Sequence, residues 1–280
     1  MTGLTLDLYQ VDAFSQRIFS GNPAAVVPLD DWPDDSLLQA IASENNLSET
    51  AFFQGQSGRY QLRWFTPACE VPLCGHATLA TAFVIFRHFE PHADQVVFDT
   101  SSGELTVGRS GDALVLDFPA YEIVSCNAPE QLIKALGLVP KSVGRTEPDH
   151  NYYVVLGSQA EVANLQPDMV MLKALHPYGV VVTARGDNCD FVSRYFAPSY
   201  GIPEDPVTGS IHCALVPYWS ARLGRTTLSA RQISDRGGDI ECEWQAERVL
   251  LKGFAVEYLK GQIYLPQDRL VQSSAVEDAV

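Results

Sequence analysis

An internal duplication constrains the fold of this 280-residue chain more than any other feature. The string RWFTP at residues 63–67 returns as RYFAP at residues 194–198, an offset of 131. After three extra residues in the second copy, Gly75-His76-Ala77 matches Gly209-Ser210-Ile211. A period near half the chain length indicates two homologous lobes, because the repeats of solenoid proteins are much shorter. Equivalent elements of two such lobes usually face each other, so we expect the matched turns on opposite walls of one cleft.

Each copy of the duplication reads as a strand followed by a helix. Residues 60–65 and 191–196 are aromatic-rich runs that end at a proline, as strands do. A turn that contains glycine and an apolar segment of helical length follow each run, at 75–86 and at 208–222. The matched turns therefore lie where a strand passes into a helix.

Short strands dominate the rest of the chain, which contains few helical patterns. Runs rich in β-branched and aromatic residues predict strands at 4–14, 24–28, 51–54, 95–100, 105–109, 113–118, 152–156, 179–184 and 249–258. We therefore predict an α+β fold of two pseudo-symmetric lobes, each a curved sheet around one long apolar helix. The expected division is an N-terminal lobe at residues 1–120 and a C-terminal lobe at residues 121–261.

The charge of the chain excludes several classes of partner. The formal net charge is -15 and no run of Lys and Arg occurs, so we expect neither nucleic acid nor a membrane as a partner. The first residues lack a basic segment followed by an apolar one, and there is no long apolar stretch, which predicts a cytoplasmic protein. An anionic substrate would need local positive potential, and helix N-termini provide it.

The missing motifs weigh against bound metals and nucleotides. The six cysteines include no C-x-x-C pair, and the sequence shows no His-Cys-carboxylate cluster with ligand spacing. No G-x-G-x-x-G opens a helix, and no Walker-type loop occurs. We therefore expect no metal and no cofactor, which leaves proton transfer as the favoured chemistry.

Four titratable residues lie next to the strand and helix junctions. Glu49 comes where a helix ends and a strand begins, and it is either an acid/base group or a plain surface carboxylate. His76 opens the first helix, a position that lowers an imidazole pKa and keeps the ring neutral. Cys74 lies beside the same N-terminus, which stabilises a thiolate, although a buried thiol is the simpler interpretation. Asp205 precedes the second helix, where it either caps free N–H groups or takes a substrate proton.

The duplication also pairs unlike groups. At the offset of 131, Asp205 falls opposite Cys74, and a thiol facing a carboxylate argues against a racemase with two thiols. Thr208-Gly209-Ser210 resembles a cradle for an oxyanion or a carboxylate, with Thr208 or Ser210 as the expected helix N-cap. Gly21-Asn22-Pro23 either approaches a ligand or is an ordinary tight turn.

Six segments, in chain order, resemble the signature blocks of the PhzF-like family. They are Asp12-Ala13-Phe14, Gly21-Asn22-Pro23-Ala24, Asn46-Leu47-Ser48-Glu49-Thr50-Ala51-Phe52, Phe65-Thr66-Pro67, Cys74-Gly75-His76-Ala77-Thr78 and Glu204-Asp205-Pro206-Val207-Thr208-Gly209-Ser210. The family comprises phenazine-biosynthesis-type isomerases with a diaminopimelate epimerase-like fold. The resemblance spans most of the chain.

The resemblance implies a fold and an assembly. Each lobe is expected to be a barrel-like sheet wrapped round a central helix, and members of the family commonly form homodimers. The segment 262–280 is expected to return to the N-terminal lobe. Its residues 262–266 are expected to form the last strand.

The resemblance also implies roles for individual residues. The acid/base carboxylate of the family falls on Glu49. Its site His, Asp and Ser fall on His76, Asp205 and Ser210. We expect the catalytic residues to be Glu49, His76 and Asp205, and the substrate contacts to come from Asn22, Cys74, Gly75, Ala77, Thr208, Gly209 and Ser210.

The resulting hypothesis is a cofactor-independent isomerase that moves a proton on a small carboxylate-bearing substrate in the interlobe cleft. Glu49 would remove a proton from a carbon made acidic by its neighbours and return it on the same face. Backbone N–H groups at 75–77 and 209–211 would hold the substrate carboxylate. The alternatives are an amino-acid epimerase or racemase that uses Cys74, with Asp205 or Glu49 as the other base, and a non-catalytic small-molecule-binding protein.

Overall fold

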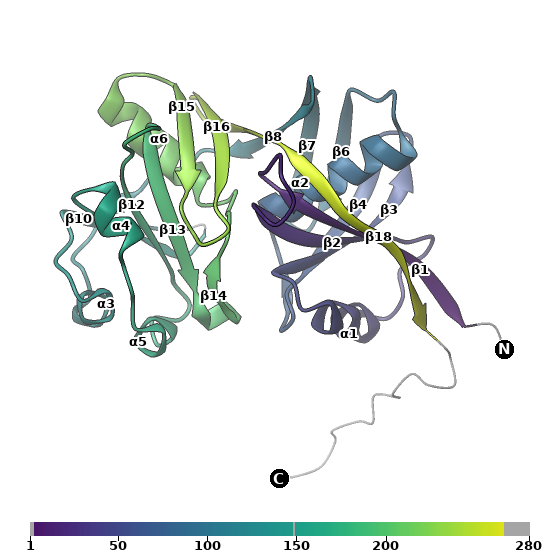
Figure 1. Cartoon of the computed structure of the whole chain (residues 1–280), viewed down its shortest axis with the longest axis horizontal. Helices are drawn as coiled ribbons and strands as arrows, with labels where there is room; N and C mark the ends of the chain where they lie inside the picture. Colours follow the sequence, from purple (N-terminus) through teal and green to yellow (C-terminus); the bar gives the residue numbers. More distant parts are fainter. Residues whose placement is uncertain (1–2, 148, 266–280) are drawn as a thin grey trace, which may run out of the picture.

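The computed structural model describes residues 3–147 and 149–265. It consists of two lobes that lie side by side, each a curved sheet around one buried helix (Figure 1). The α+β fold predicted from the sequence is therefore confirmed. No helix within the described ranges is long and apolar enough to cross a membrane.

The N-terminal lobe is built from nine strands, one of which comes from the far end of the described chain. These strands are β1 (Leu4–Ala13), β2 (Asn22–Pro28), β3 (Glu49–Gln56), β4 (Arg59–Phe65), β5 (Glu70–Val71), β6 (Gln95–Thr100), β7 (Gly103–Ser110), β8 (Ala113–Pro119) and β18 (Ala255–Leu265). The helices are α1 (Asp35–Asn45) on the outside and α2 (Gly75–Val84) inside, which continues into a π-helical turn at Ile85–Phe89.

The C-terminal lobe repeats this plan. Its strands are β9 (Val124–Ser125), β10 (Ser142–Thr146), β11 (Asn151–Val155), β12 (Gly179–Arg185), β13 (Phe191–Ala197), β14 (Ile202–Asp205), β15 (Thr227–Gln232), β16 (Gly238–Gln245) and β17 (Arg248–Gly253). Its inner helix is α6 (His212–Leu223), and its other helices are α3 (Glu130–Leu136), α4 (Gln159–Ala163), α5 (Met169–Lys173) and a 3-10 turn at Pro198–Tyr200.

Strand pairing follows the same order in both lobes. In the first lobe β2 pairs with β3 in parallel, β3 with β4 antiparallel, and β4 with β6 in parallel. In the second lobe β11 pairs with β12 in parallel, β12 with β13 antiparallel, and β13 with β15 in parallel. The two lobes are therefore copies in topology as well as in sequence.

The lobes exchange their final strands. After β8 the chain crosses to β9, which pairs with β10 in the second lobe, and after β17 it crosses back to β18, which pairs with β1. Strands β8 and β17 pair antiparallel, so the two sheets form one continuous ladder. The strand that rejoins the first lobe begins at Ala255, earlier than the expected residue 262, and residues 266–280 of the expected returning segment lie outside the described ranges.

The single strand predicted at 249–258 is wrong, because the chain changes lobes within it. Strand β17 ends at Gly253 and β18 begins at Ala255, with the Phe254 carbonyl accepting a hydrogen bond from the backbone N–H of Ser15. The Phe14 ring packs so tightly on Gly253 that an added Cβ would lie 2.4 Å from its Cδ1. Glycine is therefore required where the chain crosses.

The two inner helices anchor the lobes differently. Helix α2 is buried on nearly every side, and most of its residues are apolar, while the hydroxyls of Thr78 and Thr81 donate to backbone carbonyls one turn earlier. Helix α6 contains Pro217, which has no N–H to donate to the Cys213 carbonyl one turn earlier. That carbonyl instead accepts the backbone N–H of Tyr121, 2.9 Å away, in the segment that crosses from β8 to β9. The carbonyl that Pro217 leaves free thus fixes the segment that connects the two lobes between β8 and β9.

Candidate active site

The N-termini of α2 and α6 meet at two glycines. A Cβ on Gly75 would lie 3.0 Å from the Gly209 Cα, and a Cβ on Gly209 would lie 3.2 Å from the Gly75 Cα. Any side chain at either position would push the helices apart. This contact also corrects the sequence register, because it places Cys74 opposite Thr208 and not opposite Asp205.

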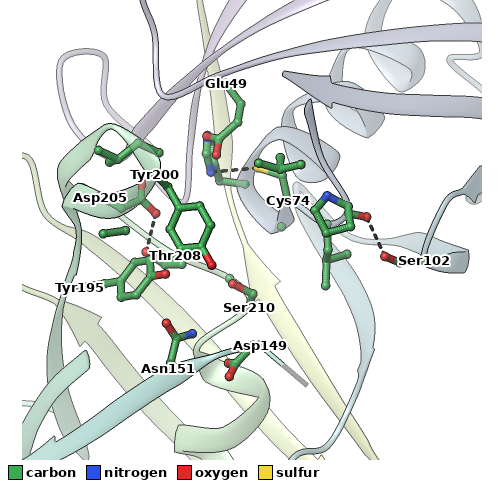
Figure 2. Close-up of a pocket in the computed structure, with 18 of the residues that line it drawn as sticks. Glu49, Cys74, Ser102, Asp149, Asn151, Tyr195, Tyr200, Asp205, Thr208 and Ser210 are labelled. Carbon is green, nitrogen blue, oxygen red and sulfur yellow. Dashed lines mark hydrogen bonds and ion pairs between the residues drawn. The ribbon is translucent and has the colours of Figure 1, made fainter. Parts of the chain in front are cut away.

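A cavity of about 300 Å³ opens beside the two N-termini and is lined by residues of both lobes (Figure 2). Eight of the predicted site residues line it: Glu49, Cys74, Gly75, His76, Asp205, Thr208, Gly209 and Ser210. Two do not. Asn22 is fully buried behind the cavity, and the side chain of Ala77 packs in the hydrophobic core.

Glu49 is the first residue of β3 and lies 8 % exposed at the cavity wall. The chain reaches it through Asn46, whose left-handed conformation ends helix α1. Its Oε2 lies 3.2 Å from the Nε2 of His76, although the two atoms are not aligned as a hydrogen bond. Burial, followed by the nearby Asp205 carboxylate, raises the pKa of Glu49 well above its usual range. The group is therefore protonated over a wider pH range than an exposed glutamate.

His76 is a neutral imidazole whose Nε2 lies beside Glu49. Its Nδ1 accepts from the Asn22 amide at 3.0 Å and lies 3.4 Å from the Cys74 sulfur, which leaves Nε2 to carry the proton. Burial lowers the pKa of His76 to about 3. The sequence attributed this lowering to the helix N-terminus, whereas burial is its cause.

We expect the ring of His76 to stay neutral from pH 8 down to about pH 4. Its pKa is lowered, so the neutral form persists below the range in which an exposed histidine takes up a proton. The imidazole proton resonances of His76, assigned by comparison with His76→Gln, should not shift in this range. A titration midpoint near pH 6.5, the usual value for an unperturbed histidine, would contradict this result.

Asn22 connects the two lobes through one amide group. Its Nδ2 lies 2.7 Å from the Asp205 Oδ1 and 2.9 Å from the Val207 carbonyl oxygen, in addition to the His76 contact. The hydroxyl of Thr208 donates to the other Asp205 oxygen. Burial raises the pKa of Asp205 to about 6 even though these donors favour the carboxylate. A single side chain therefore joins His76 of the first lobe to Asp205 of the second.

The sequence predicted that Thr208 or Ser210 would cap helix α6, but neither of them does. The helix begins at His212 with Ile211 at the N-cap and no side-chain cap hydrogen bond. The hydroxyl of Thr208 is used by Asp205, and its backbone N–H donates to Oε1 of the fully buried Gln232. Gln232 also donates to the Asp205 carbonyl at 2.7 Å, so it supports this turn, and no motif in the sequence indicated it.

Cys74 is a buried thiol, which is the simpler of the two states that the sequence left open. It is 5 % exposed, and burial together with Glu49 raises its pKa well above the usual value. One donor atom each of Cys74, Glu49 and His76 lie within 4.8 Å of one another, a set that could hold a metal ion. The sequence showed no such cluster because its members come from two separate segments of the chain. Both Cys74 and Glu49 would have to lose a proton before they could act as ligands.

The counterpart of Glu49 in the second lobe is a glycine. Glu49 pairs with Ala24 at the start of β3, and Gly179 pairs with Asn151 at the start of β12. A Cβ on Gly179 would lie 2.5 Å from the Asn151 Oδ1 and 2.6 Å from the Tyr195 hydroxyl oxygen. These two side chains occupy the space where a glutamate equivalent to Glu49 would stand, so the carboxyl groups that the second lobe presents to the cavity come from other positions, Asp149 and Asp205.

Several lining residues were not singled out by the sequence as site residues. They include Asp149, Asn151, Tyr195 and Tyr200 of the second lobe and Ser102 of the first (Figure 2). Tyr195 lies inside the duplicated string, so the repeat could have indicated it. The others follow no periodic pattern.

Comparisons with known proteins agree on a family. A sequence profile described as "Phenazine biosynthesis-like protein" matches residues 11–261. An uncharacterized isomerase of Pseudomonas aeruginosa is 51% identical over 262 residues, which cover 94% of this chain and all of that protein. The crystal structure of a phenazine biosynthesis protein of the PhzF family from Enterococcus faecalis has a TM-score of 0.88 and 44% identity, and the match covers 94% of this chain and all of that one.

A more distant likeness concerns the fold alone. The structure of a probable proline racemase from Agrobacterium radiobacter superposes with a TM-score of 0.67 at 12% identity, covering 95% of this chain and 94% of that chain. The diaminopimelate epimerase-like fold expected from the sequence is thus confirmed.

Proposed function

The chain belongs to the phenazine biosynthesis-like protein family, and from this premise we propose that it is an isomerase that moves a proton on a small carboxylate-bearing substrate without a cofactor. The observation that carries the proposal is a single buried carboxyl, Glu49, that faces the cavity with a raised pKa beside a neutral His76. A carboxyl whose pKa is raised toward the working pH suits a group that both removes and returns a proton.

The substrate carboxylate would bind at the paired helix N-termini. The first backbone N–H groups of a helix have no partner within it, and those at 75–77 and 209–211 converge beside the cavity because Gly75 and Gly209 touch. The same groups would stabilise negative charge that develops when a proton leaves the neighbouring carbon. This arrangement supplies positive potential without a basic side chain.

Glu49 would take the proton and deliver it to a second carbon on the same face of the substrate. His76, as a neutral donor through Nε2, would orient the Glu49 carboxylate and stabilise it once ionised. Asp205 would bind a polar group of the substrate from the second lobe, held in place by Asn22 and Thr208. One base acting on one face yields a shifted double bond and not an inverted centre.

An epimerase or racemase needs a base on each face of the substrate, and two features speak against it. The counterpart of Glu49 is Gly179, and the residue opposite Cys74 across the two glycines is Thr208, whose hydroxyl is engaged by Asp205. A threonine hydroxyl is a far weaker base at neutral pH than a thiolate or a carboxylate. These features favour the single-base isomerase over a racemase with equivalent bases in the two lobes, and a racemase that pairs Cys74 with Asp205 or Glu49 is tested by the variant below.

Replacing Cys74 by alanine separates the two enzyme classes. We expect Cys74→Ala to keep proton exchange within about tenfold of wild type, because the thiol contributes packing and a weak hydrogen bond but no proton. Exchange would be followed by NMR in heavy water. A loss as large as that of Glu49→Gln would show that Cys74 acts as a base, and Cys213→Ala serves as a control for loss of a buried thiol away from the cavity.

The proposed activity is tested by incubating the protein in heavy water with a panel of unsaturated and amino-substituted small carboxylates. Deuterium entering one compound, measured by mass spectrometry and NMR, together with a new double-bond position, would support the isomerase. Exchange with inversion of a stereocentre would support the racemase. Tight binding without exchange in any compound would support the third possibility, a binding protein that kept the polar cavity.

A homodimer and a cytoplasmic location remain proposals. Within the described residues the outer edge of β18 pairs with no other strand, and Tyr258 and Tyr264 are exposed on it. An unpaired edge flanked by aromatic side chains is a surface on which a second copy could pack.

A further inference from the structure

We propose that Arg236, which lies outside the cavity, is a positioning residue for the proton transfer: it fixes the turn that carries Asn22 and thereby keeps the ring proton of His76 on Nε2. This inference rests on the proposed function, in which His76 orients Glu49 through that nitrogen. Arg236 belongs to the β15–β16 turn, residues 233–237. The structure describes the whole of this turn, and none of its residues lines the cavity, so any effect on the reaction is indirect.

The turn that carries Asn22 is held by the second lobe. The backbone N–H of Gly21 donates to the Gly237 carbonyl at 2.8 Å, and the Gly21 carbonyl accepts from Nε of Arg236 at 2.8 Å. Nη2 of Arg236 also donates to Oδ1 of the buried Asp12 at 2.7 Å. Both backbone groups of Gly21 are thus bound across the lobe boundary. Because Asn22 is the next residue, the second lobe sets its position.

The same segment of the second lobe also supports Asp205. Gln232, the last residue of β15, donates to the Asp205 carbonyl at 2.7 Å. The hydroxyl of Ser234 donates to the Pro206 carbonyl at 2.7 Å. One short segment therefore contacts both of the turns whose side chains meet at the lobe boundary, that of Asn22 and that of Asp205.

The amide of Asn22 is sensitive to a small displacement. Its nitrogen carries two hydrogens. Three acceptors lie within 3.0 Å of it, namely Nδ1 of His76, Oδ1 of Asp205 and the Val207 carbonyl oxygen. A shift of the amide therefore changes which acceptors receive a hydrogen bond. If Nδ1 of His76 loses this donor, the ring proton can move to Nδ1, since the Cys74 thiol 3.4 Å away is only a weak donor.

The location of the ring proton decides what His76 does for Glu49. Oε2 of Glu49 lies 3.2 Å from Nε2 of His76. A proton on Nε2 favours the ionised carboxyl, whereas an unprotonated Nε2 is an acceptor and favours the protonated carboxyl. Arg236 therefore acts on the base through Asn22 and His76, without touching the substrate.

The position of the ring proton is measured by NMR on the full chain at pH 7, with no ligand added. The ¹⁵N shifts of the two ring nitrogens of His76 report which of them carries the proton, and wild type should show a protonated Nε2. Arg236→Gln removes the contacts of the guanidinium and should lower the ratio of Nε2–H to Nδ1–H by roughly three- to tenfold, the range that one hydrogen bond contributes. Unchanged ring resonances in this variant would overturn the inference.

Arg248→Gln is the matched control, because it removes a comparable contact between the lobes that does not reach Asn22. Nε of Arg248 donates to Oδ1 of Asp117 at 2.7 Å, and Nη2 donates to the Asp117 carbonyl at 3.0 Å, between β17 and β8. The His76 resonances of this variant should match those of wild type. A change as large as that of Arg236→Gln would show that any loosening of the lobes has this effect, and the specific role of Arg236 would be lost.

Arg236→Lys separates positioning from stability. Lysine keeps a positive charge beside Asp12 but donates from a single point, so it cannot serve Asp12 and the Gly21 carbonyl in the fork of a guanidinium. We expect a melting temperature within about 3 °C of wild type, since one hydrogen bond is lost, together with the change at His76 that Arg236→Gln shows. Wild-type His76 resonances in Arg236→Lys would mean that the charge stabilises the fold and positions nothing.

Proton exchange distinguishes a failure of this inference from a failure of the proposed isomerase. For any compound that wild type labels in heavy water, Arg236→Lys should lower kcat by roughly ten- to hundredfold, as a small misplacement of a catalytic group does, and change KM by less than about threefold. An unchanged kcat would overturn the positioning role and leave the isomerase. A change at His76 that depends on Arg236, in a protein that labels no compound, would support the link and count against the isomerase.

Discussion

Replacing Glu49 by glutamine is expected to slow deuterium incorporation into a substrate by about 10²- to 10⁴-fold, the range that a positioned acid/base group contributes. Glutamine keeps the shape of the side chain and its position beside His76, 3.2 Å away, but has no proton to exchange. The measurement is the single-turnover exchange rate in heavy water, followed by mass spectrometry.

The same variant carries a second signature in its stability. Burial raises the pKa of Glu49 in the folded protein, so the carboxyl favours folding below the unfolded pKa of about 4.3 and loses that contribution as pH rises through the folded pKa. Glu49→Gln should therefore melt at a higher temperature than wild type at pH 8 and at a similar temperature at pH 4. Glu44→Gln, an exposed site on α1, is the control. A variant that is inactive and also less stable at pH 8 would indicate a structural role instead.

Asn22→Asp is expected to destabilise the protein by about 3 to 5 kcal/mol at pH 8, the cost of an uncompensated buried charge. The new carboxylate would lie where the amide nitrogen now contacts Asp205 Oδ1 at 2.7 Å, and the Val207 carbonyl would lose its donor. For a chain of this size the melting temperature should fall by roughly 10 °C. Exchange activity should be lost as well, because His76 and Asp205 would both be displaced.

The pH dependence of the stability of Asn22→Asp identifies the cause of its destabilisation. Two facing buried carboxyls have raised pKa values, so the variant is close to wild type in stability near pH 4 and loses stability as pH rises through the folded pKa values. Asn22→Leu removes the donors without adding charge, and its deficit should not depend on pH in the same way. Asn127→Asp, at an exposed position, should change little. A pH-independent deficit for Asn22→Asp would show that lost hydrogen bonds and not charge repulsion are responsible.

The elements that the sequence predicted are those whose pattern is local. The aromatic runs of β4 and β13 and the apolar length of α2 are visible in a few neighbouring residues, and the duplication shows that they occur twice. The shortest strands, such as β5 and β9 with two residues each, exist only because a partner strand is present. Strand β16 was not predicted, although it alternates buried residues with exposed, mostly acidic ones, a local pattern typical of a half-buried strand.

Some residues of the candidate site could likewise be predicted from local sequence and others could not. Glu49, His76 and Asp205 each follow a recognisable junction, and the fold brings them to one cavity. The actual state of Cys74 could not be read from its position at a helix N-terminus, because burial outweighs the helix dipole in setting its pKa. The positions of Asn151 and Tyr195 depend on the absence of a side chain at Gly179, a strand residue distant from Asn151 in sequence. Such relations appear only when the chain is folded.

The reciprocal exchange of β9 and β18 has a consequence for synthesis of the protein on the ribosome. The outer edge of β1 stays open until β18 has been translated, because Leu4–Ala13 pairs with Ala255–Leu265. At about 5 to 20 residues per second, that partner follows β1 out of the ribosome after roughly 10 to 50 seconds. The nascent first lobe thus has an exposed strand edge throughout elongation, and its last strand is added only after the second lobe has emerged. We therefore expect the two lobes to mature together once β18 has emerged, with chaperones protecting the open edge until then.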